Sequence, residues 1–571
     1  MIYTLKGEND IFNPLEQVLK NREIKDIQKF LNPSINDLIP YNALRNMDKA
    51  IYLLLRHIRD NSVIGVLVDP DADGISSSAS FVSYIKKAFP EIELIFYMHS
   101  GKQHGLTTEI VEQIHETQPD LLVIPDAGSN DYEQLEELNK YLDLLILDHH
   151  ESEKESEHAI VVNNQLSPEY ENKSLSGVGI VYKFLKALDD KLELDYADEY
   201  LDLVALGNVG DVMRLDVPET RYLVYEGLKN IKNEFLLNLI AKNAKDVKEI
   251  TPKVLSFKII PQINAMIRVG DAEQKLDVFR AMVGEQEEFF NTRTKKTETL
   301  PQKAARLCTN AYAKQRRVRD KWTEIIKLQI EEQELDKNAF IVLNVDNFDK
   351  ELSGYIASNL TGIYKKPVLL MSWNEESKSY TGSLRGYETV IRDSKSFLNS
   401  LEAFEFVSGH ANAAGFSIKK DELEKLPDLI NEKMEYTNAD SEPTEVDFVL
   451  TEKGLTLNLI NDIIKYEGLW GFGASEPLFA VKDIEVDVSK IIINKLTGRF
   501  MLNGIEFIQF QLNDNLVELA GQNKIATCDF VGKVNVNNWL GKVTSQFIIE
   551  AVDIKETKDN DLTFDLFDLF G

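Results

Sequence analysis

Short apolar runs recur at regular intervals between residues 60 and 165 of the chain. They cover residues 63–68, 93–97, 121–124, 144–147 and 159–162, and helix-like segments such as 77–89 and 107–115 separate them. Strands that alternate with helices in this way predict a parallel sheet with both faces covered. We therefore expect an α/β domain in this part of the chain.

The pattern changes further along the chain. Residues 175–240 read as helical, and no strand pattern occurs between about 285 and 335. A second α/β pattern begins near residue 339, and short alternating runs after a linker at 436–444 predict a small β-barrel. The predicted parts are a first domain with an N-terminal helical extension (1–285), a basic connecting helix (286–335), a second α/β domain (336–437), a barrel domain (438–558) and an acidic, aromatic tail (559–571).

The net charge of the chain bears on whether the protein binds nucleic acid. The chain has 64 Lys and Arg against 94 Asp and Glu, a net charge of −30, which argues against general binding of nucleic acid over the whole surface. The segment from Lys303 to Lys327 inverts this balance, with eight basic and two acidic residues. Such a segment is either a solvated helix face or a surface for an anionic ligand.

Cysteine content and hydropathy indicate the compartment. Cys308 and Cys528 are the only cysteines, too few for a disulfide framework or a cysteine zinc site. No apolar run approaches the ~20 residues that cross a bilayer, and the first residues do not form a secretory signal. We expect a cytoplasmic protein without contact to a membrane.

The most informative motif follows the first apolar run. Asp69, Asp71 and Asp73 alternate with other residues and precede Gly74, so an extended segment would project three carboxylates to one side. Crowded carboxylates repel unless a cation compensates, and hard oxygen ligands suit Mg²⁺, Mn²⁺ or Ca²⁺. An EF-hand is excluded because Ser80 occupies the position of its twelfth-residue glutamate. A polar turn with Asp side chains bonded to backbone amides is the alternative.

Further candidate ligands follow later elements. Asp126 follows the third apolar run, Asp148, His149 and His150 follow the fourth, and Asp211 follows a helical segment. Because the carboxyl ends of parallel strands share one edge of a sheet, we expect these side chains on one rim. Imidazole together with carboxylates favours Mn²⁺ over Ca²⁺. A centre with two ions ~3.5–4 Å apart, of the kind that mostly serves phosphoester cleavage, accounts for so many ligands.

These motifs together resemble the DHH/DHHA1 phosphoesterase superfamily, and within it the RecJ-type single-strand-specific exonucleases. The resemblance is carried by residues 69–74, 126–128, 148–150, 175–179 and 201–211, by 353–358, 382–385 and 408–415 in the DHHA1 part, and by 470–473 and 538–541 in the oligonucleotide-binding (OB) part. It extends from about residue 45 to 555. It implies a parallel-sheet DHH domain joined by a long helix to an α/β DHHA1 domain, followed by an OB-like β-barrel.

The resemblance also implies roles for individual residues. Two ions, Mn²⁺ or Mg²⁺, would be bound by Asp69, Asp71, Asp73, Asp126, His149 and Asp211. Asp148 would orient a histidine and His150 would contact the scissile phosphate. Ser383, Arg385 and His410 would hold DNA phosphates beside the basic connecting helix. His99 stands where the family has an arginine of the pocket for the terminal 5′ phosphate, and Lys102 is a candidate to replace it.

The function implied is a metal-dependent single-stranded-DNA exonuclease that works 5′→3′ and releases mononucleotides in DNA recombination or repair. One alternative is a DHH/DHHA1 phosphodiesterase for short oligoribonucleotides or cyclic dinucleotides, and another is a replication scaffold without catalysis. The ~130 residues beyond 438 favour the first, since OB folds bind single strands. We expect a monomer whose partner is single-stranded DNA. The tail at Leu566–Phe570 is either a docking peptide for a replication or repair protein or a frayed end.

Overall fold

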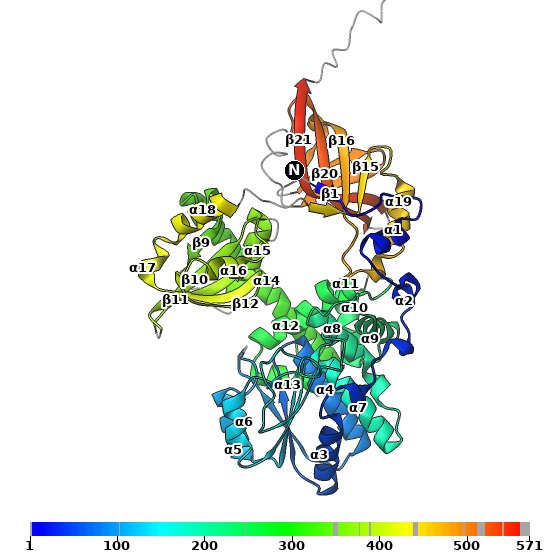
Figure 1. Cartoon of the computed structure of the whole chain (residues 1–571), viewed down its shortest axis with the longest axis vertical. Coiled ribbons are helices and arrows are strands. Elements are labelled where there is room, and N and C mark those ends of the chain that lie inside the picture. The colour runs from blue at the N-terminus through cyan, green and yellow to red at the C-terminus, as the bar shows by residue number, and fades with distance from the viewer. Residues whose placement is uncertain are drawn as a thin grey trace, which may run out of the picture. The chain divides into compact units, whose positions relative to one another are not determined.

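The computed structural model describes residues 3–101, 103–245, 247–345, 352–375, 377–387, 390–437, 444–494, 497–510, 520–539 and 542–559. The chain divides into two units (Figure 1). The first unit comprises residues 23–315 and 465–476, and the second comprises residues 1–22, 316–464 and 477–571.

A five-stranded parallel sheet forms the centre of the first unit. Its strands, in spatial order, are β3 (Leu94–Met98), β2 (Ile64–Val68), β4 (Leu121–Pro125), β5 (Asp143–Asp148) and β6 (Ile160–Asn163). Helices α3 (Met47–Arg59), α4 (Ala72–Ala88) and α7 (Gly177–Leu192) pack on one face, and α5 (Thr108–Thr117) and α6 (Tyr132–Leu138) on the other (Figure 1). The order reverses between β2 and β4, so the carboxyl ends of these two strands form a switch point, where ligands bind in open α/β sheets.

Helices complete this unit on the α4 and α7 side. They are α2 (Ile27–Leu31), α8 (Leu201–Gly210), α9 (Pro218–Lys229), α10 (Glu234–Asn243), α11 (Pro252–Val254), α12 (Ile260–Val269) and α13 (Ala272–Val283). A hairpin of β7 (Glu288–Asn291) and β8 (Lys296–Thr299) follows, so the expectation of no strand between 285 and 335 is wrong. Both strands have only four residues; β8 is entirely polar and β7 has two polar and two apolar residues, so neither shows a clear alternating pattern.

The connecting helix α14 (Leu300–Glu332) is 33 residues long. Its first half contributes Ala304 and Cys308 to the core of the first unit, and its second half contributes Ile326 and Ile330 to the core of the second. Part of its basic charge is paired within the protein, as Lys303 lies 2.7 Å from Asp277.

The second α/β sheet has the strand order β12 (Phe404–His410), β13 (Ala413–Ile418), β11 (Ser379–Arg385), β10 (Val368–Asn374) and β9 (Ile341–Asn344). Only β9 and β10 pair in parallel; the other neighbours are antiparallel. The associated helices are α15 (Ser353–Tyr364), α16 (Ser394–Asn399), α17 (Lys420–Leu423) and α18 (Leu426–Thr437).

The C-terminal sheet contains seven strands. Their order is β15 (Phe448–Thr451), β16 (Phe479–Asp487), β20 (Lys524–Trp539), β21 (Lys542–Asp559), β19 (Ile505–Phe510), β18 (Thr497–Leu502) and β17 (Ile492–Asn494). Phe507 is fully buried against Phe500, Phe530 and Phe547, which form an aromatic core. Helix α19 (Leu457–Ile464) follows β15.

The first residues of the chain belong with this C-terminal sheet. Strand β1 (Tyr3–Leu5) pairs in parallel with β14 (Thr444–Val446), and α1 (Pro14–Asn21) contacts α19. Arg22 grips Asp447 with two hydrogen bonds, of 3.0 and 2.8 Å. The sequence pattern places residues 1–22 in the first domain, whereas strand pairing joins them to β14, some 440 residues later, in a separate two-stranded sheet of the second unit.

The predicted fold class is confirmed, with a parallel α/β sheet, a long helix, a second α/β sheet and a C-terminal β domain. Across the described residues, no helix combines the length and the apolar character needed to span a bilayer. The tail at Leu566–Phe570 lies outside the described residues.

Candidate metal centre

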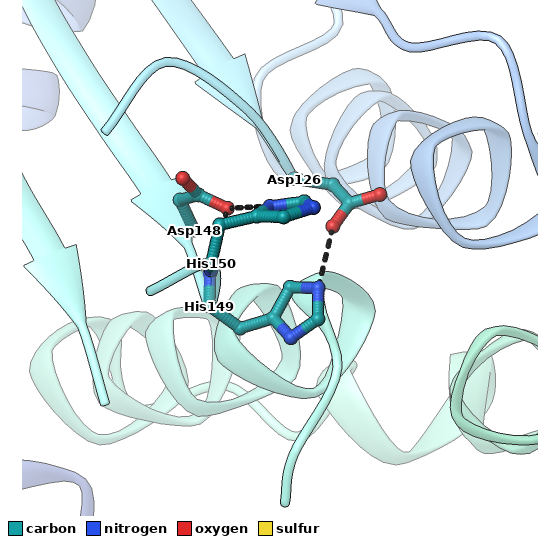
Figure 2. A group of neighbouring side chains, drawn as sticks. All are labelled: Asp126, Asp148, His149 and His150. Carbon is teal, nitrogen blue, oxygen red and sulfur yellow. Dashed lines mark hydrogen bonds and ion pairs between the residues drawn. The ribbon is translucent and has the colours of Figure 1, made fainter. Parts of the chain in front are cut away.

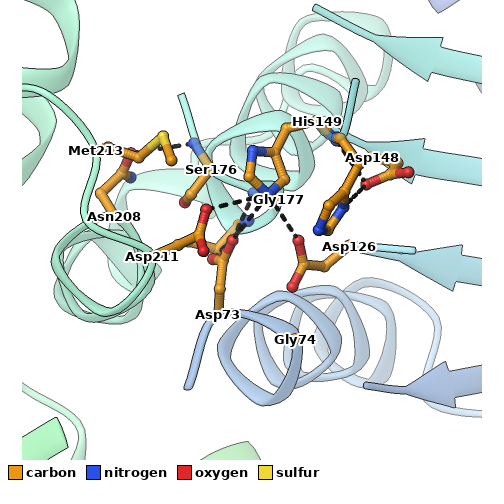
Figure 3. Close-up of polar contacts among 12 residues, drawn as sticks. Asp73, Gly74, Asp126, Asp148, His149, Ser176, Gly177, Asn208, Asp211 and Met213 are labelled. Carbon is orange, nitrogen blue, oxygen red and sulfur yellow. Dashed lines mark hydrogen bonds and ion pairs between the residues drawn. The ribbon is translucent and has the colours of Figure 1, made fainter. Parts of the chain in front are cut away.

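Acidic and imidazole side chains from five elements converge at the switch point of the first sheet (Figure 3). Asp69 directly follows β2, Asp126 follows β4, Asp148 ends β5, and His149 comes next. Asp73 lies in the first turn of α4, and Asp211 follows the last residue of α8.

His149 lies at the centre of one group. Its Nε2 is 3.2 Å from Asp126 Oδ1, 3.4 Å from Asp211 Oδ2 and 3.8 Å from Asp73 Oδ2. A second group consists of Asp69, Asp71 and Asp126, with ligand atoms within 4.8 Å of one another. Asp126 belongs to both groups, so the arrangement is suited to two ions that share one carboxylate.

The Asp69–Gly74 segment is not extended throughout, as its alternating carboxylates suggested. Asp71 caps α4, because its Oδ1 accepts hydrogen bonds of 2.9 Å from the backbone N–H groups of Asp73 and Gly74. The helix therefore begins at Ala72, ahead of the helix-like segment 77–89, and the expectation of three carboxylates on one extended segment is wrong for Asp73.

Two glycines make room for the carboxylates. A Cβ at Gly177 would lie 2.3 Å from Asp126 Oδ1, and a Cβ at Gly207 would lie 2.2 Å from Asp73 Oδ1. Asp73 also accepts backbone hydrogen bonds from Gly177 (2.7 Å) and Val178 (3.1 Å), so the positive end of α7 supports its charge. The 175–179 stretch therefore shapes the metal centre through backbone atoms.

Electrostatics also favour a divalent cation at this place. Burial and the neighbouring carboxylates raise the pKa of Asp73 to about 6 and that of Asp211 to about 8. Burial also lowers the pKa of His149 to about 4, so its imidazole is neutral, as a ligand must be. Positive charge would relieve the repulsion that keeps protons on these carboxylates.

The available donor atoms fit such an ion as well. Asp126 Oδ1 and His149 Nε2 are buried, and neither atom has a hydrogen-bond partner. The two atoms lie 3.2 Å apart, but this ion-pair contact does not have the geometry of a hydrogen bond. Carboxylate oxygens with one imidazole nitrogen are a donor set suited to Mn²⁺ and Mg²⁺.

Asp148 and His150 form a hydrogen-bonded pair beside these ligands (Figure 2). Asp148 Oδ1 lies 2.8 Å from His150 Nδ1 and also accepts from the backbone N–H of His149 (2.7 Å), while Oδ2 accepts from Ser129 N–H (3.2 Å). Burial opposes ionisation of Asp148, but these partners outweigh it and hold its pKa well below the usual range. Burial lowers the pKa of His150, but Asp148 raises it more, to about 9. His150 is therefore cationic at neutral pH, and its side chain is 40% exposed.

His104 is a further member of the site that the sequence pattern does not single out. Its Nδ1 lies 2.6 Å from Asp69 Oδ2, and its ring centroid lies 4.7 Å from that of His150. The next residue, Gly105, donates its N–H to Asp69 Oδ1 at 3.0 Å. The only signal in the sequence is the position of His104 beside Gly105, in the same short stretch as His99.

His99 lies deeper than a phosphate-binding role suggests. Its side chain is fully buried, neither ring nitrogen has a hydrogen-bond partner, and Nε2 lies 3.9 Å from Asp69 Oδ1. Burial lowers its pKa to about 4, so the ring is neutral. The ammonium of Lys275 donates to the carbonyl oxygens of His99 (3.2 Å) and Ser100 (2.7 Å). Lys102 lies outside the described residues.

The predicted phosphate-binding residues form a separate cluster in the second unit. Ser383 and Arg385 lie on β11 and His410 ends β12; Arg385 and His410 both pair with Ala413 of the strand between them. Ser383 Oγ is 2.8 Å from Ser353 Oγ, and Ser353 lines a pocket of about 220 Å³.

Comparison with known proteins decides the family. Residues 63–208 match the DHH family N-terminal domain, and residues 446–551 match the RecJ OB domain. A putative SPbeta prophage-derived single-strand DNA-specific exonuclease, YorK of Bacillus subtilis, is 38% identical over 99% of this chain and 100% of its own length. The chain belongs to the RecJ-type family of DHH phosphoesterases.

More distant RecJ-type proteins agree with this assignment. RecJ of Bacillus subtilis is 25% identical over 95% of this chain and 67% of its own length. The crystal structure of Thermus thermophilus RecJ with Mn²⁺ has a TM-score of 0.70 at 21% identity, and covers 95% of this chain and 76% of that chain. The corresponding Mg²⁺ complex has a TM-score of 0.64 at 19% identity, over 95% of this chain and 75% of that chain. These structures support the RecJ-type fold of the chain.

Proposed function

We propose that this protein is a metal-dependent exonuclease specific for single-stranded DNA, which degrades the strand 5′→3′ and releases mononucleotides in DNA recombination or repair. One observation carries the proposal. All six expected ligand positions occur at the switch point of a chain that matches a single-strand DNA-specific exonuclease over its full length.

In this proposal Asp69, Asp71, Asp73, Asp126, His149 and Asp211 hold two Mn²⁺ or Mg²⁺ ions. When bound, such ions supply charge stabilisation for the attacking and leaving oxygens of an in-line displacement. Asp148 keeps His150 cationic and fixes its ring, so that His150 contacts a non-bridging oxygen of the scissile phosphate. His104 holds Asp69 in place through the 2.6 Å hydrogen bond.

Substrate binding is assigned to the second unit. Arg385 carries a planar guanidinium that can grip two phosphate oxygens, and Ser383 and His410 add further donors. The C-terminal sheet, which matches the RecJ OB domain, binds the single strand. The OB match also argues against a phosphodiesterase for short oligoribonucleotides or cyclic dinucleotides. We also propose that the protein acts as a monomer in the cytoplasm, with a replication or repair protein as the candidate partner of its tail at Leu566–Phe570.

The test uses single-stranded DNA labelled at its 5′ or 3′ end, with Mn²⁺, against a duplex of the same sequence. Early release of the 5′ label as mononucleotide, with duplex spared and Asp126→Ala inactive, is the expected result. Half of the substrates carry a 5′ phosphate and half do not. The difference in degradation rate between them measures how far the enzyme depends on that phosphate with His99 in place of the family's arginine. Cleavage of dinucleotides or cyclic dinucleotides, with no release from either end of the strand, would refute the proposal.

A further inference from the structure

A pocket of about 600 Å³ opens in the first unit, where the segment at 465–469 meets the end of α9 and the residues before α11. Both sides are fixed to each other. Tyr225 donates its hydroxyl to Gly468 O at 2.6 Å, and Lys253 pairs with Glu476 at 2.6 Å and with Glu467 at 3.5 Å. The volume lies in the range of small-molecule sites, and these contacts make the pocket preformed.

The rim of this pocket is locally basic. Three lysines, Lys229, Lys248 and Lys465, line it together with one glutamate, Glu249, in a protein of net charge −30. Lys229 is also paired with Glu226 at 2.7 Å. The ring of Tyr466 also lines the pocket and is 39% exposed. Ammonium groups bind phosphate oxygens, and an exposed aromatic ring can stack on a base.

We propose that this lysine-rimmed pocket binds a nucleotide, with its phosphate at the lysines and its base against Tyr466. The proposal rests on the proposed function for the identity of the ligand, since both the substrate strand and its product are chains or units of nucleotides. The lining holds two aromatic residues, Tyr225 and Tyr466. Tyr225 is held by its hydrogen bond to Gly468 O and lies beside the guanidinium of Arg221, so the more exposed Tyr466 is the stacking surface that the proposal uses.

The pocket is distinct from the metal centre. Gly227, near the pocket end of α9, packs so closely on the start of α8 that a Cβ would lie 2.0 Å from Leu201 O. Asp211 follows the other end of α8, whose 10 residues span about 15 Å. The pocket therefore does not hold the scissile phosphate. It takes either a nucleotide farther along the same strand or a free mononucleotide.

The test measures binding of full-length protein in EDTA, so that no strand is cleaved. Fluorescent dT12 and dT2 are compared by anisotropy, since a dinucleotide is too short to reach both sites, and dTMP is titrated by calorimetry. The variants are Lys248→Glu/Lys465→Glu, Tyr466→Ala and Tyr466→Phe. Lys140→Glu reverses one exposed lysine elsewhere in the first unit and shows the effect of net charge for each reversed lysine.

If the pocket takes the strand, the double variant lowers the ratio of dT12 to dT2 affinity about tenfold. It also reduces the slope of log affinity against log salt concentration for dT12 by about 1.4. Tyr466→Ala lowers the same ratio, whereas Tyr466→Phe and Lys140→Glu keep it. If the pocket takes a free nucleotide, the double variant and Tyr466→Ala lose dTMP binding instead. Wild-type values for both ligands in every variant would overturn the proposal. A separate digestion with Mn²⁺ keeps this outcome apart from failure of the exonuclease assignment, which would show as an intact strand with wild-type protein.

Discussion

Replacement of Gly177 by alanine should inactivate the enzyme without unfolding it. The new Cβ would lie 2.3 Å from Asp126 Oδ1 and 2.5 Å from Asp126 Cβ, distances that real Cβ atoms do not show. The carboxylate of Asp126 must therefore move by about 1 Å, far more than the ~0.2 Å tolerance of a metal-ligand bond. A displacement of about 1 Å at a reacting centre costs on the order of 10²-fold in rate. Overpacking costs about 1–3 kcal/mol, and the gain in helix propensity of about 1 kcal/mol offsets part of it.

A matched control lies two residues along the same helix. A Cβ at Gly179 would lie 2.4 Å from Leu175 Cδ1, so Gly179→Ala produces a similar overlap against an apolar side chain. We expect both variants to lose similar stability in urea unfolding, while only Gly177→Ala loses about 10²-fold in kcat and binds Mn²⁺ more weakly in calorimetry. Wild-type activity of Gly177→Ala, or an equal loss in Gly179→Ala, would refute the role assigned to Gly177.

Three further predictions concern the same sites. His104→Ala should weaken Mn²⁺ binding by about 10- to 100-fold because it frees Asp69, whereas the surface variant His115→Ala should not; equal affinities would contradict this. The metal-free protein should become less stable as pH rises from about 6 to 8, since the raised pKa values of Asp211, about 8, and His150, about 9, favour the folded state only while these groups keep their protons. Between pH 4 and 6 the lowered pKa values of His149 and His99, both about 4, offset the loss from Asp73 and Asp211. Melting temperatures in EDTA and in Mn²⁺ check this, and a decline that Mn²⁺ leaves unchanged would contradict it. Arg385→Lys should raise KM for single-stranded DNA about tenfold with a smaller change in kcat, because an ammonium loses the two-point grip on phosphate; an unchanged KM would contradict this.

The sequence predicts much of the first unit because its strands are buried on both faces. The runs ending before Asp69, Asp126 and Asp148 are nearly continuous in apolar residues, and the side chain that follows each run faces the switch point. The first residues of helices are harder to predict from the sequence. Helix α4, for example, begins at Ala72 inside the acidic motif, with Asp71 as its N-cap. The contribution of His104 depends on a loop that folds back over β2, which no periodicity encodes.

The pairing of segments that lie far apart in the chain could not be predicted from the sequence either. Strand β1 has only three residues and pairs with β14, which is equally short. The segment at 465–476 follows α19 of the second unit, yet it packs within the first. Its Trp470 is buried, and Leu469 O accepts a hydrogen bond from the guanidinium of Arg221. The order of motifs along the sequence therefore does not show that residues 1–22 belong to the second unit or that residues 465–476 belong to the first.

The pairing of β1 with β14 affects how the protein is made. Residues 3–5 leave the ribosome about 440 residues before their partner strand, so at roughly 5–20 residues per second they wait about 20–90 s for it. The first unit waits as well, because residues 465–476 complete its surface around Arg221. A nascent chain that has passed the DHH region therefore holds its six proposed ligand positions in an incomplete unit. Full assembly of the nuclease is delayed until nearly the whole polypeptide has been synthesised.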